Sequence, residues 1–238
     1  MLIAHEAPVP NIPLVRELTD LDFMIAHFVH EEPGYVEVCR KRPKGRCLIL
    51  DNGFFELHEP FSPRELFETA KMIKADCVIA PDIVDDFPST REMVKEFLAL
   101  TNGSKLTIGA VVVGKDPGEM VECFKWYASL PIIEMICWSF LGPRAEALSL
   151  IQKVPLDKAH HLLGFSTLDE LAQVLPYFPG GCSIDTMKPV SAAYNKKEWG
   201  DIGRGGYKRP GMQEKVESIL LAENILEFRK RVQRVESE

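Results

Sequence analysis

The chain alternates short apolar segments rich in β-branched residues with longer segments of helical periodicity, and this alternation restricts the fold more than any other feature. Such a pattern is typical of βα units built around a parallel sheet. The segments expected to form strands are 2–5, 23–28, 48–51, 77–81, 106–112, 132–138, 160–164 and 182–185. Eight such units predict an α/β fold, a TIM-type (β/α)8 barrel, whose chemistry lies at the carboxyl ends of its strands.

Three of the intervening segments carry signals for the start of a helix. In "SPRELFETAKMIKA", Ser62 is expected to be the N-cap, followed by proline at the first helical position. The segment "STREMVKEFLAL" predicts a capping box from Ser89 and Glu92, and "STLDELAQVL" predicts another from Ser166 and Asp169. These helices are expected to cover the sheet.

The chain is expected to form one domain over residues 1–238. With 238 residues and 46% hydrophobic content, it is large enough for one substantial core, and no repeat or low-complexity linker divides it. The first two units are the least regular, and "VHEEPGYVEVCRKRPKG" is compatible with an extra hairpin. The last helix is expected over roughly 212–234.

The sequence predicts a soluble protein of the cytoplasm. The opening "MLIAHEAPVPNIP" lacks a basic segment and a sustained apolar run, and no stretch reaches the roughly 18 apolar residues of a membrane span. The cysteines form no C-x-x-C pair, so they are expected to be buried reduced thiols. They are Cys39, Cys47, Cys77, Cys123, Cys137 and Cys182.

Positive charge is concentrated in two places on an acidic chain. The formal net charge is −7, yet residues 188–215 hold seven basic and three acidic residues, which makes this segment +4 and the remainder −11. The densest basic run is "RKRPKGR" at 40–46. Each place is equally compatible with a solvated loop and with an anion-binding surface.

Aspartates directly follow three of the predicted strands. Asp51 ends "LILD", Asp82 ends "CVIAPD" and Asp185 ends "CSID". A lone aspartate there is commonly a turn or N-cap residue, but in a barrel three of them would point into one site. Carboxyl groups whose environments separate their pKa values can act as nucleophile and as acid or base on a glycosidic bond.

Other chemistries lack their sequence signals. The histidines are scattered, no H-E-x-x-H occurs, and the adjacent His160 and His161 are expected to be structural. The chain contains no phosphate-binding loop of the G-x-x-x-x-G-K-[ST] type and no serine nucleophile elbow.

Five motifs, in order, resemble the tRNA-guanine transglycosylase (queuine tRNA-ribosyltransferase) superfamily, whose members exchange guanine in nucleic acid for a 7-deazaguanine. They are "LDNGFFE" (50–56), "APDIVDD" (80–86), "GAVVVG" (109–114), "HLLGFSTLDEL" (161–171) and "DTMKPVSAAYN" (185–195). The resemblance covers about residues 48–195 and implies the same barrel as the strand pattern.

The resemblance implies a role for each aspartate. Asp185 would be the nucleophile that attacks C1′, Asp51 the general acid and base, and Asp82 the group that receives the N–H edge of the purine. Backbone at Gly114 and Gly164 would approach the base. The other substrate-binding positions that we expect are Asn52, Gly53, Trp138 and Ser139.

The chain departs from the family pattern at several places. Val113 stands where the family usually has glutamine, and Trp138 and Ser139 in "MICWSFLG" replace a glycine-rich stretch, so the incoming base is left open. No cysteine follows Cys182, so the zinc element of the tRNA enzymes is not expected. A compact form without zinc is similar to the phage and bacterial branch that places bases such as preQ0 in DNA.

The basic segment 186–215 is expected to bind nucleic acid on the catalytic side of the barrel. Its stretch "KKEWGDIGRGGYKRPGM" combines basic and aromatic residues that suit a phosphate backbone and stacked bases. The run at 40–46 precedes its strand and should lie on the opposite face. The expected nucleic-acid contacts are Lys188, Asn195, Lys196, Lys197, Arg204, Lys208 and Arg209.

Several alternatives remain at this point. The expected substrate is DNA, with tRNA as the alternative and a free 7-deazaguanine base as second substrate. The resemblance also implies a relation to queuosine and archaeosine chemistry, and the host cytoplasm as location if a phage encodes the chain. A non-catalytic accessory subunit, a hydrolase and a barrel with another small-molecule substrate are the rival functions. No cofactor and no membrane partner are expected, and a homodimer is left open.

Overall fold

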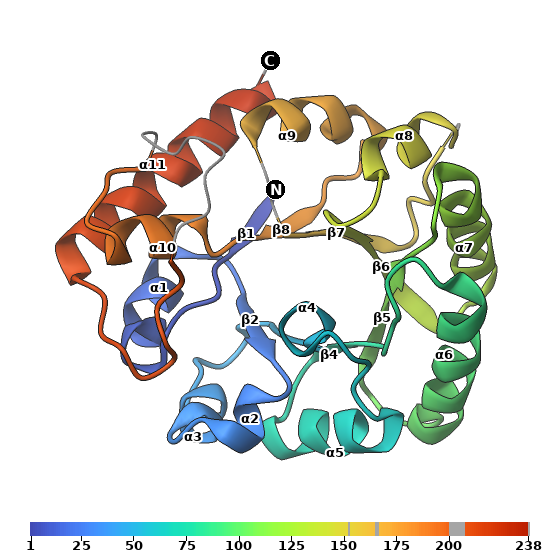
Figure 1. Ribbon diagram of the computed structural model, residues 1–238, viewed down its shortest axis with the longest axis horizontal. Helices are drawn as coiled ribbons and strands as arrows, with labels where there is room; N and C mark the ends of the chain where they lie inside the picture. The colour runs from blue at the N-terminus through green and yellow to red at the C-terminus, as the bar shows by residue number, and fades with distance from the viewer. Residues whose placement is uncertain (152, 165–166, 200–207, 238) are drawn as a thin grey trace.

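The computed structural model shows eight parallel strands surrounded by helices (Figure 1). It describes residues 1–151, 153–164, 167–199 and 208–237. The strands are β1 (Leu2–Ala4), β2 (Asp22–Ile25), β3 (Leu48–Asp51), β4 (Cys77–Ile79), β5 (Thr107–Val112), β6 (Ile133–Ser139), β7 (Ala159–Leu163) and β8 (Ser183–Asp185). Each predicted strand is confirmed, with ends that differ by at most three residues from those expected.

The strands form a nearly closed barrel in the order β1-β8-β7-β6-β5-β4-β3-β2. No backbone ladder joins β1 to β2 within the described residues. Asp20, in the turn before β2, spans this seam instead: its N–H donates to the carbonyl of Ile3, and its Oδ2 accepts from the N–H of Ile3, both at 2.9 Å. The α/β barrel predicted from the sequence is therefore confirmed.

Strand register identifies the residues that point inward. A Cβ added to Gly109 would lie 2.7 Å from Met135 Cε and 3.5 Å from Cys137 Sγ, so these residues of the adjacent strands β5 and β6 point to the same side of the sheet. Cys137 is in register with His161, and His161 with Ser183. Because side chains alternate along a strand, Asp185, two residues beyond Ser183, also faces inward at the carboxyl end.

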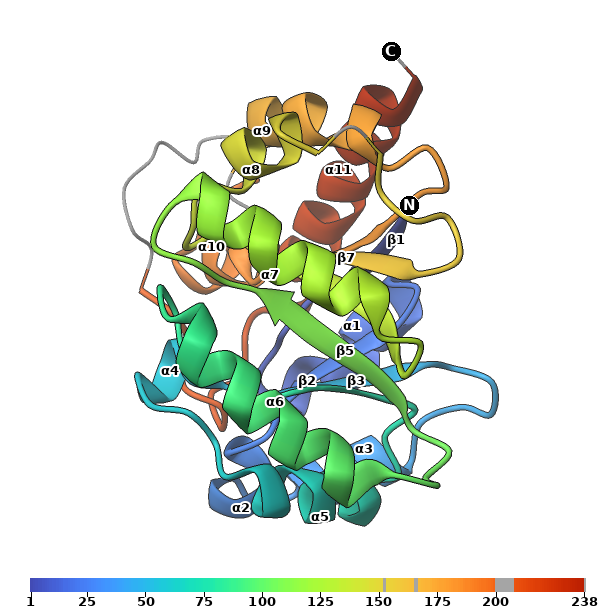
Figure 2. The same ribbon diagram turned by 90° about the vertical axis from the view of Figure 1, so that its right-hand side faces the viewer.

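Helices cover the outside of the barrel, and α4 lies inside their ring in Figure 1, while Figure 2 shows the outer layer from the side. The α-helices are α1 (Ile12–Leu18), α2 (Phe28–Glu31), α3 (Tyr35–Arg40), α4 (Phe54–Leu57), α5 (Pro63–Ile73), α6 (Phe87–Thr101), α7 (Pro117–Ser129), α8 (Arg144–Ser149), α9 (Leu168–Val174), α10 (Lys188–Tyr194) and α11 (Ser218–Ser237). Short 3-10 helices are η1 (Val9–Asn11) and η2 (Leu175–Tyr177). The hairpin considered after β2 is wrong, because that segment forms α2 and α3.

The helix starts only partly follow the sequence signals. Ser62 does precede α5, but its side chain makes no capping hydrogen bond. Helix α6 begins before the predicted box of Ser89 and Glu92, because Asp86 is the N-cap and its Oδ1 accepts from the Ser89 N–H at 3.0 Å. An aspartate ahead of proline supplied a stronger cap than the serine farther along.

Helix α9 is capped one residue later than expected. Thr167 is its N-cap, and Thr167 Oγ1 accepts from the N–H of Glu170 at 3.1 Å. Ser166, the predicted cap, lies outside the described residues. The last helix, α11, begins at Ser218, several residues later than the expected start near 212.

All six cysteines are free thiols, and five are buried, but Cys47 is exposed, which corrects the expectation that all would be buried. Among the helices of the described chain, none has the length and apolarity needed to cross a membrane.

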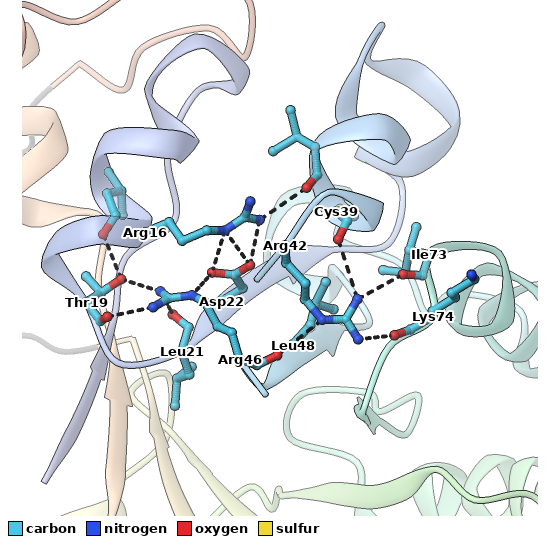
Figure 3. Close-up of polar contacts among 12 residues, drawn as sticks. Arg16, Thr19, Leu21, Asp22, Cys39, Arg42, Arg46, Leu48, Ile73 and Lys74 are labelled. Atoms are coloured by element: carbon cyan, nitrogen blue, oxygen red, sulfur yellow. Dashed lines mark hydrogen bonds and ion pairs between the residues drawn. The ribbon is translucent and has the colours of Figure 1, made fainter. Parts of the chain in front are cut away.

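The basic run at 40–46 lies at the amino ends of the strands and is occupied by structural contacts (Figure 3). Arg46 pairs with Asp22, the first residue of β2, and also donates to the carbonyls of Thr19 and Leu21 at 2.7 and 2.9 Å. Arg42 donates to Asp76 Oδ2 at 3.0 Å and to neighbouring carbonyls. Both arginines therefore hold the amino end of the barrel together.

Candidate active site

Three acidic side chains gather at the carboxyl end of the barrel. Asp51 is the last residue of β3, Asp185 is the last residue of β8, and Asp82 follows β4 by three positions. They are close enough to influence one another, since the negative charges of Asp82 and Asp185 both help to raise the pKa of Asp51. The fold brings together aspartates that are as much as 134 positions apart in the sequence.

Asp185 is held in a fixed orientation through one of its oxygens. Its Oδ1 accepts from the N–H of Gly164 at 3.0 Å and lies 3.1 Å from His161 Nε2. The other ring nitrogen of His161 lies 2.7 Å from Ser183 Oγ, which fixes the ring. Within the described part of the chain, Asp185 Oδ2 has no hydrogen-bond partner.

Asp51 is a buried acid with a raised pKa. Burial raises the pKa of Asp51 well above its ordinary value, and the negative charge of Glu56 raises it further. A hydrogen bond from the Gly53 N–H to Asp51 Oδ2, at 3.0 Å, opposes this rise without cancelling it. The surroundings of Asp51 therefore favour its protonated form.

Asp82 is positioned by the neighbouring strand. Asn52 Nδ2 donates to Asp82 Oδ1 at 2.7 Å and to the carbonyl of Ala80 at 2.8 Å. The other end of the amide, Asn52 Oδ1, accepts from the N–H of Phe54 at 2.9 Å. Burial raises the pKa of Asp82 to about 7, against the opposing hydrogen bond from Asn52. Asn52 is thus buried as a support for Asp82.

Two glycines beside the acids lie where a side chain would clash with neighbouring atoms. Gly53 has φ +78°, and a Cβ there would lie 2.8 Å from His27 Nδ1. Gly164 has φ +59°, and a Cβ there would lie 2.2 Å from the ring of Phe140. A side chain at Gly164 would therefore displace Phe140 and disturb the N–H that holds Asp185.

Not every predicted substrate-binding residue is brought to these acids. Trp138 is fully buried, and its ring packs 5.4 Å from that of Phe124 in α7, on the opposite side of β6 from the inward-facing Cys137. This corrects the expectation that Trp138 fills the space beside the substrate base. Packing explains why residue 114 is glycine, because a Cβ at Gly114 would lie 2.6 Å from the backbone N of Met120.

Ser139 lies closer to the expected place. It is the last residue of β6 and, two positions after Cys137, points to the same inner side. Its Oγ accepts from the N–H of Leu141 at 3.1 Å. The serine hydroxyl therefore shapes the loop that carries Phe140.

Further acidic groups at this end were not anticipated from the sequence. Glu56 in α4 accepts from Arg209 Nη1 at 3.1 Å through Oε1, while Glu56 Oε2 is buried without a partner among the described residues. Burial raises the pKa of Glu56, and Arg209 lowers it. Glu6, which follows β1, is also buried, with a pKa raised to about 8 chiefly by burial.

The place of His161 differs from the one expected from the sequence. It was expected to be structural like His160, but it contacts the carboxyl group of Asp185 directly. His160 does have packing contacts, with Nε2 3.0 Å from the carbonyl of Pro155 and the Trp138 indole N–H donating to its Nδ1 at 3.4 Å. The strand places these neighbours on opposite faces.

The basic segment 186–215 is not one continuous loop, because its first part forms α10. Lys188 begins this helix and is half-buried, and burial lowers its pKa. Asn195 ends it and is used internally, since its Nδ2 donates to the carbonyls of Ser191 and Lys208. Asn195 therefore fastens residue 208 to the helix.

The remaining basic residues differ in their surroundings. Lys196 and Lys197 follow α10 and are exposed. Lys208 lies over the ring of Tyr194, and Arg209 lies 4.8 Å from the ring of Phe55 while it pairs with Glu56. Arg204 lies outside the described residues. Arg209 is thus the expected nucleic-acid contact that the structure brings closest to the acids.

No group of three or more histidine, cysteine, aspartate or glutamate side chains suited to a metal ion occurs in the described parts of the chain. No protein-family model matches the chain, and no curated protein matches it either. Fold and site together define an α/β barrel with a cluster of buried acids at the carboxyl ends of its strands.

Proposed function

We propose that the protein is a base-exchange transglycosylase that replaces guanine in nucleic acid, with DNA as the expected substrate, by a 7-deazaguanine such as preQ0. The observation that carries this proposal is the pairing of Asp185 with Asp51. One carboxyl group is anchored by Oδ1 with its other oxygen unpartnered among the described residues, and a second carboxyl group with a raised pKa lies near it. The ordered motifs that resemble the transglycosylase superfamily support the same chemistry.

In the first half of the reaction, an oxygen of Asp185 attacks C1′ of the target nucleoside. The C1′–N9 bond breaks with its electron pair going to N9 of guanine, and Asp51 donates its proton to the leaving base. The product is an ester between Asp185 and the sugar, together with free guanine. The raised pKa of Asp51 suits this step, because it favours the protonated form that a general acid needs.

In the second half, the free 7-deazaguanine enters where guanine left. The Asp51 carboxylate takes the proton from N9 of the incoming base, and N9 then attacks C1′. The ester bond to Asp185 breaks and restores the carboxylate, while Asp51 is again protonated. Atoms and charges are thus balanced over the cycle without a cofactor.

Base recognition is assigned to Asp82 with its support, Asn52. A carboxylate is a natural acceptor for adjacent N–H donors of a guanine-type edge. With a pKa of about 7, Asp82 readily loses its proton when such donors bind. In duplex DNA the target nucleotide must first leave the stack, at a cost of a few kcal/mol that contacts in the site offset.

The test is incorporation of radiolabelled guanine into duplex DNA and, in parallel, into unmodified tRNA. We expect label in DNA, and we expect Asp185→Asn to lower the rate by roughly 10⁴-fold, because the amide oxygen is a poor nucleophile. The matched control is Asp157→Asn, which alters an exposed aspartate just before β7, at the other end of the barrel, and should keep the parental rate.

Each other outcome identifies a rival function. Exchange by Asp185→Asn at the parental rate would refute the assigned nucleophile. Label in tRNA alone would keep the chemistry and change the substrate. Abasic sites without incorporation would indicate a hydrolase, and no reaction with either polymer would favour an accessory subunit.

A further inference from the structure

Glu6 follows β1, the strand that pairs with β8, which ends in the proposed nucleophile. Ala4, the last residue of β1, is in register with Asp185 at the end of β8. His5 points outward, with its ring 5.2 Å from that of Phe228 in α11. Because side chains alternate, Glu6 points inward, above Ala4 and next to Asp185. The charge of Asp185 acts on the pKa of Glu6, which agrees with this placement.

The carboxyl group of Glu6 has no hydrogen-bond or ion-pair partner among the residues that the structure describes. The residue is only 7% exposed, yet it makes no hydrogen bond or ion pair with any described residue. The groups whose charges act with it are Asp185 from β8, Glu56 from α4, the Tyr35 hydroxyl from α3 and one cation, Arg209, which Glu56 already binds. Burial, followed by the charges of Glu56 and Asp185, raises the pKa of Glu6 to about 8, and Arg209 opposes this rise.

A protonated carboxyl group at this position can donate a hydrogen bond to a bound substrate. Asp82 and Asn52, which we assign to the base, follow β4 and β3, whereas Glu6 follows β1, the strand next to β8. A nucleoside with C1′ at Asp185 and its base toward Asp82 would therefore place its sugar and phosphates near Glu6. The hydrogen-bond acceptors that the nucleotide presents there are the oxygen atoms of its sugar and phosphates.

We propose that Glu6 contacts the substrate directly, donating a hydrogen bond from its carboxyl group to a sugar or phosphate oxygen of the nucleotide that Asp185 attacks. This inference rests on the proposed function, because the direction of the nucleotide follows from it. It also makes binding dependent on pH. Once Glu6 loses its proton it can no longer donate, and its negative charge repels the phosphates.

The experiment measures binding separately from exchange. A short fluorescein-labelled DNA strand with one guanine, and an RNA strand of the same sequence, are titrated with protein at pH 7 and pH 9, and anisotropy gives Kd. We expect the wild-type protein to bind the preferred strand roughly tenfold more weakly at pH 9. Glu6→Gln keeps a donor that cannot ionise, so it should bind almost equally at both values.

Glu6→Ala removes both the hydrogen-bond donor and the ionisable charge. It should bind more weakly than wild type at pH 7 and show little change at pH 9, because neither donor nor charge remains. In exchange assays it should raise KM for the nucleic acid and leave KM for free guanine unchanged. Glu59→Gln, at an exposed glutamate after α4, is the matched control and should keep the wild-type pH dependence.

Two results would overturn the assignment of Glu6. One is an equal Kd for wild type, Glu6→Gln and Glu6→Ala at both pH values, with circular dichroism showing that each is folded. The other is a rise in KM for free guanine alone, which would place Glu6 against the base. If the wild type performs no exchange, the proposed function fails, and the anisotropy series still decides whether Glu6 contacts nucleic acid.

Discussion

The two ends of the barrel treat buried charge in opposite ways. At the amino end, Asp22 is 4% exposed and is paired with both Arg16 and Arg46, and the guanidinium groups use their other N–H groups on backbone carbonyls (Figure 3). At the carboxyl end, acids outnumber cations: Arg209 is the one described guanidinium that pairs with them. The acids there are Glu6, Asp51, Glu56, Asp82 and Asp185.

The paired charges at the amino end stabilise the fold, whereas the buried acids at the carboxyl end lower its stability as the pH rises. A buried charge with hydrogen-bonded partners is strongly destabilising only when one partner is removed. A buried acid with few partners instead keeps its proton, and its raised pKa lowers stability as the pH rises. Groups of the second kind are typical of functional sites.

The largest expected effect is at the paired end. Asp22→Asn keeps the shape of the side chain and removes the charge that Arg16 and Arg46 share. Two partly buried guanidinium groups would lose their anion, so we expect the free energy of unfolding to fall by about 5 kcal/mol, near the upper end for a broken buried pair. Urea denaturation measures this change.

The control for this substitution is Glu37→Gln, which breaks the exposed pair between Glu37 and Lys41. We expect no measurable loss of stability there, because solvent screens such a pair. Under conditions where Asp22→Asn remains folded, its exchange rate should equal that of the wild type. A loss of exchange without a loss of stability would contradict the separation between the two ends.

The second effect is a pH dependence of stability at the acidic end. The folded pKa of Asp82, about 7, lies above its ordinary value of 3.8. The folded state therefore binds this proton more tightly, so the stability that it contributes is complete below about pH 4 and is lost as the pH rises toward 7. Relative to Asp82→Asn, which cannot ionise, the wild type should lose up to roughly 4 kcal/mol across this window.

Asp86 offers the opposite sign as a control. It caps α6, and its hydrogen bonds with Ser89 lower its pKa. Its contribution to stability is present at neutral pH and is lost as the pH falls, so the stability of Asp86→Asn should differ from that of the wild type more at pH 7 than at pH 3.

The prediction for Asp82 has its own contrary outcome. If the free energies of unfolding of Asp82→Asn and the wild type changed in parallel between pH 4 and 7, Asp82 would not be a buried acid.

The strand pattern predicts most of the fold because each βα unit is a local signal. The eight apolar segments and the caps near them depend on neighbours in sequence, so the barrel follows with small errors at the ends. The hairpin considered after β2 fails because "VHEEPGYVEV" has both strand-forming and helix-forming residues, and packing decides between them.

The candidate site was predictable where an acid lies at or shortly after the end of a strand. Asp51 and Asp185 end strands, Asp82 follows β4 by three positions, and Glu6 carries the same signal in "LIAHEAP", two positions after β1. Which of the neighbours His160 and His161 faces inward depends on register, which one sequence does not determine. The pair between Glu56 and Arg209 joins residues 153 positions apart, so it follows only from the folded chain.

The smallest expected effect concerns Arg209, the cation at the acidic end. Its side chain is 44% exposed, so the pair with Glu56 should contribute no more than about 1 kcal/mol. Arg209→Gln should therefore leave the thermal midpoint nearly unchanged. It should weaken oligonucleotide binding several-fold and reduce the salt dependence of log Kd by about one counterion, because one positive charge is lost.

Arg209→Lys shows which property of the side chain matters. It keeps the charge but loses the planar group that lies 4.8 Å from the ring of Phe55. We expect the salt dependence of the wild type with slightly weaker binding, since the stacking contribution is lost and the charge remains. If Arg209→Gln lowered stability by several kcal/mol and left binding unchanged, Arg209 would belong with the paired charges of the amino end.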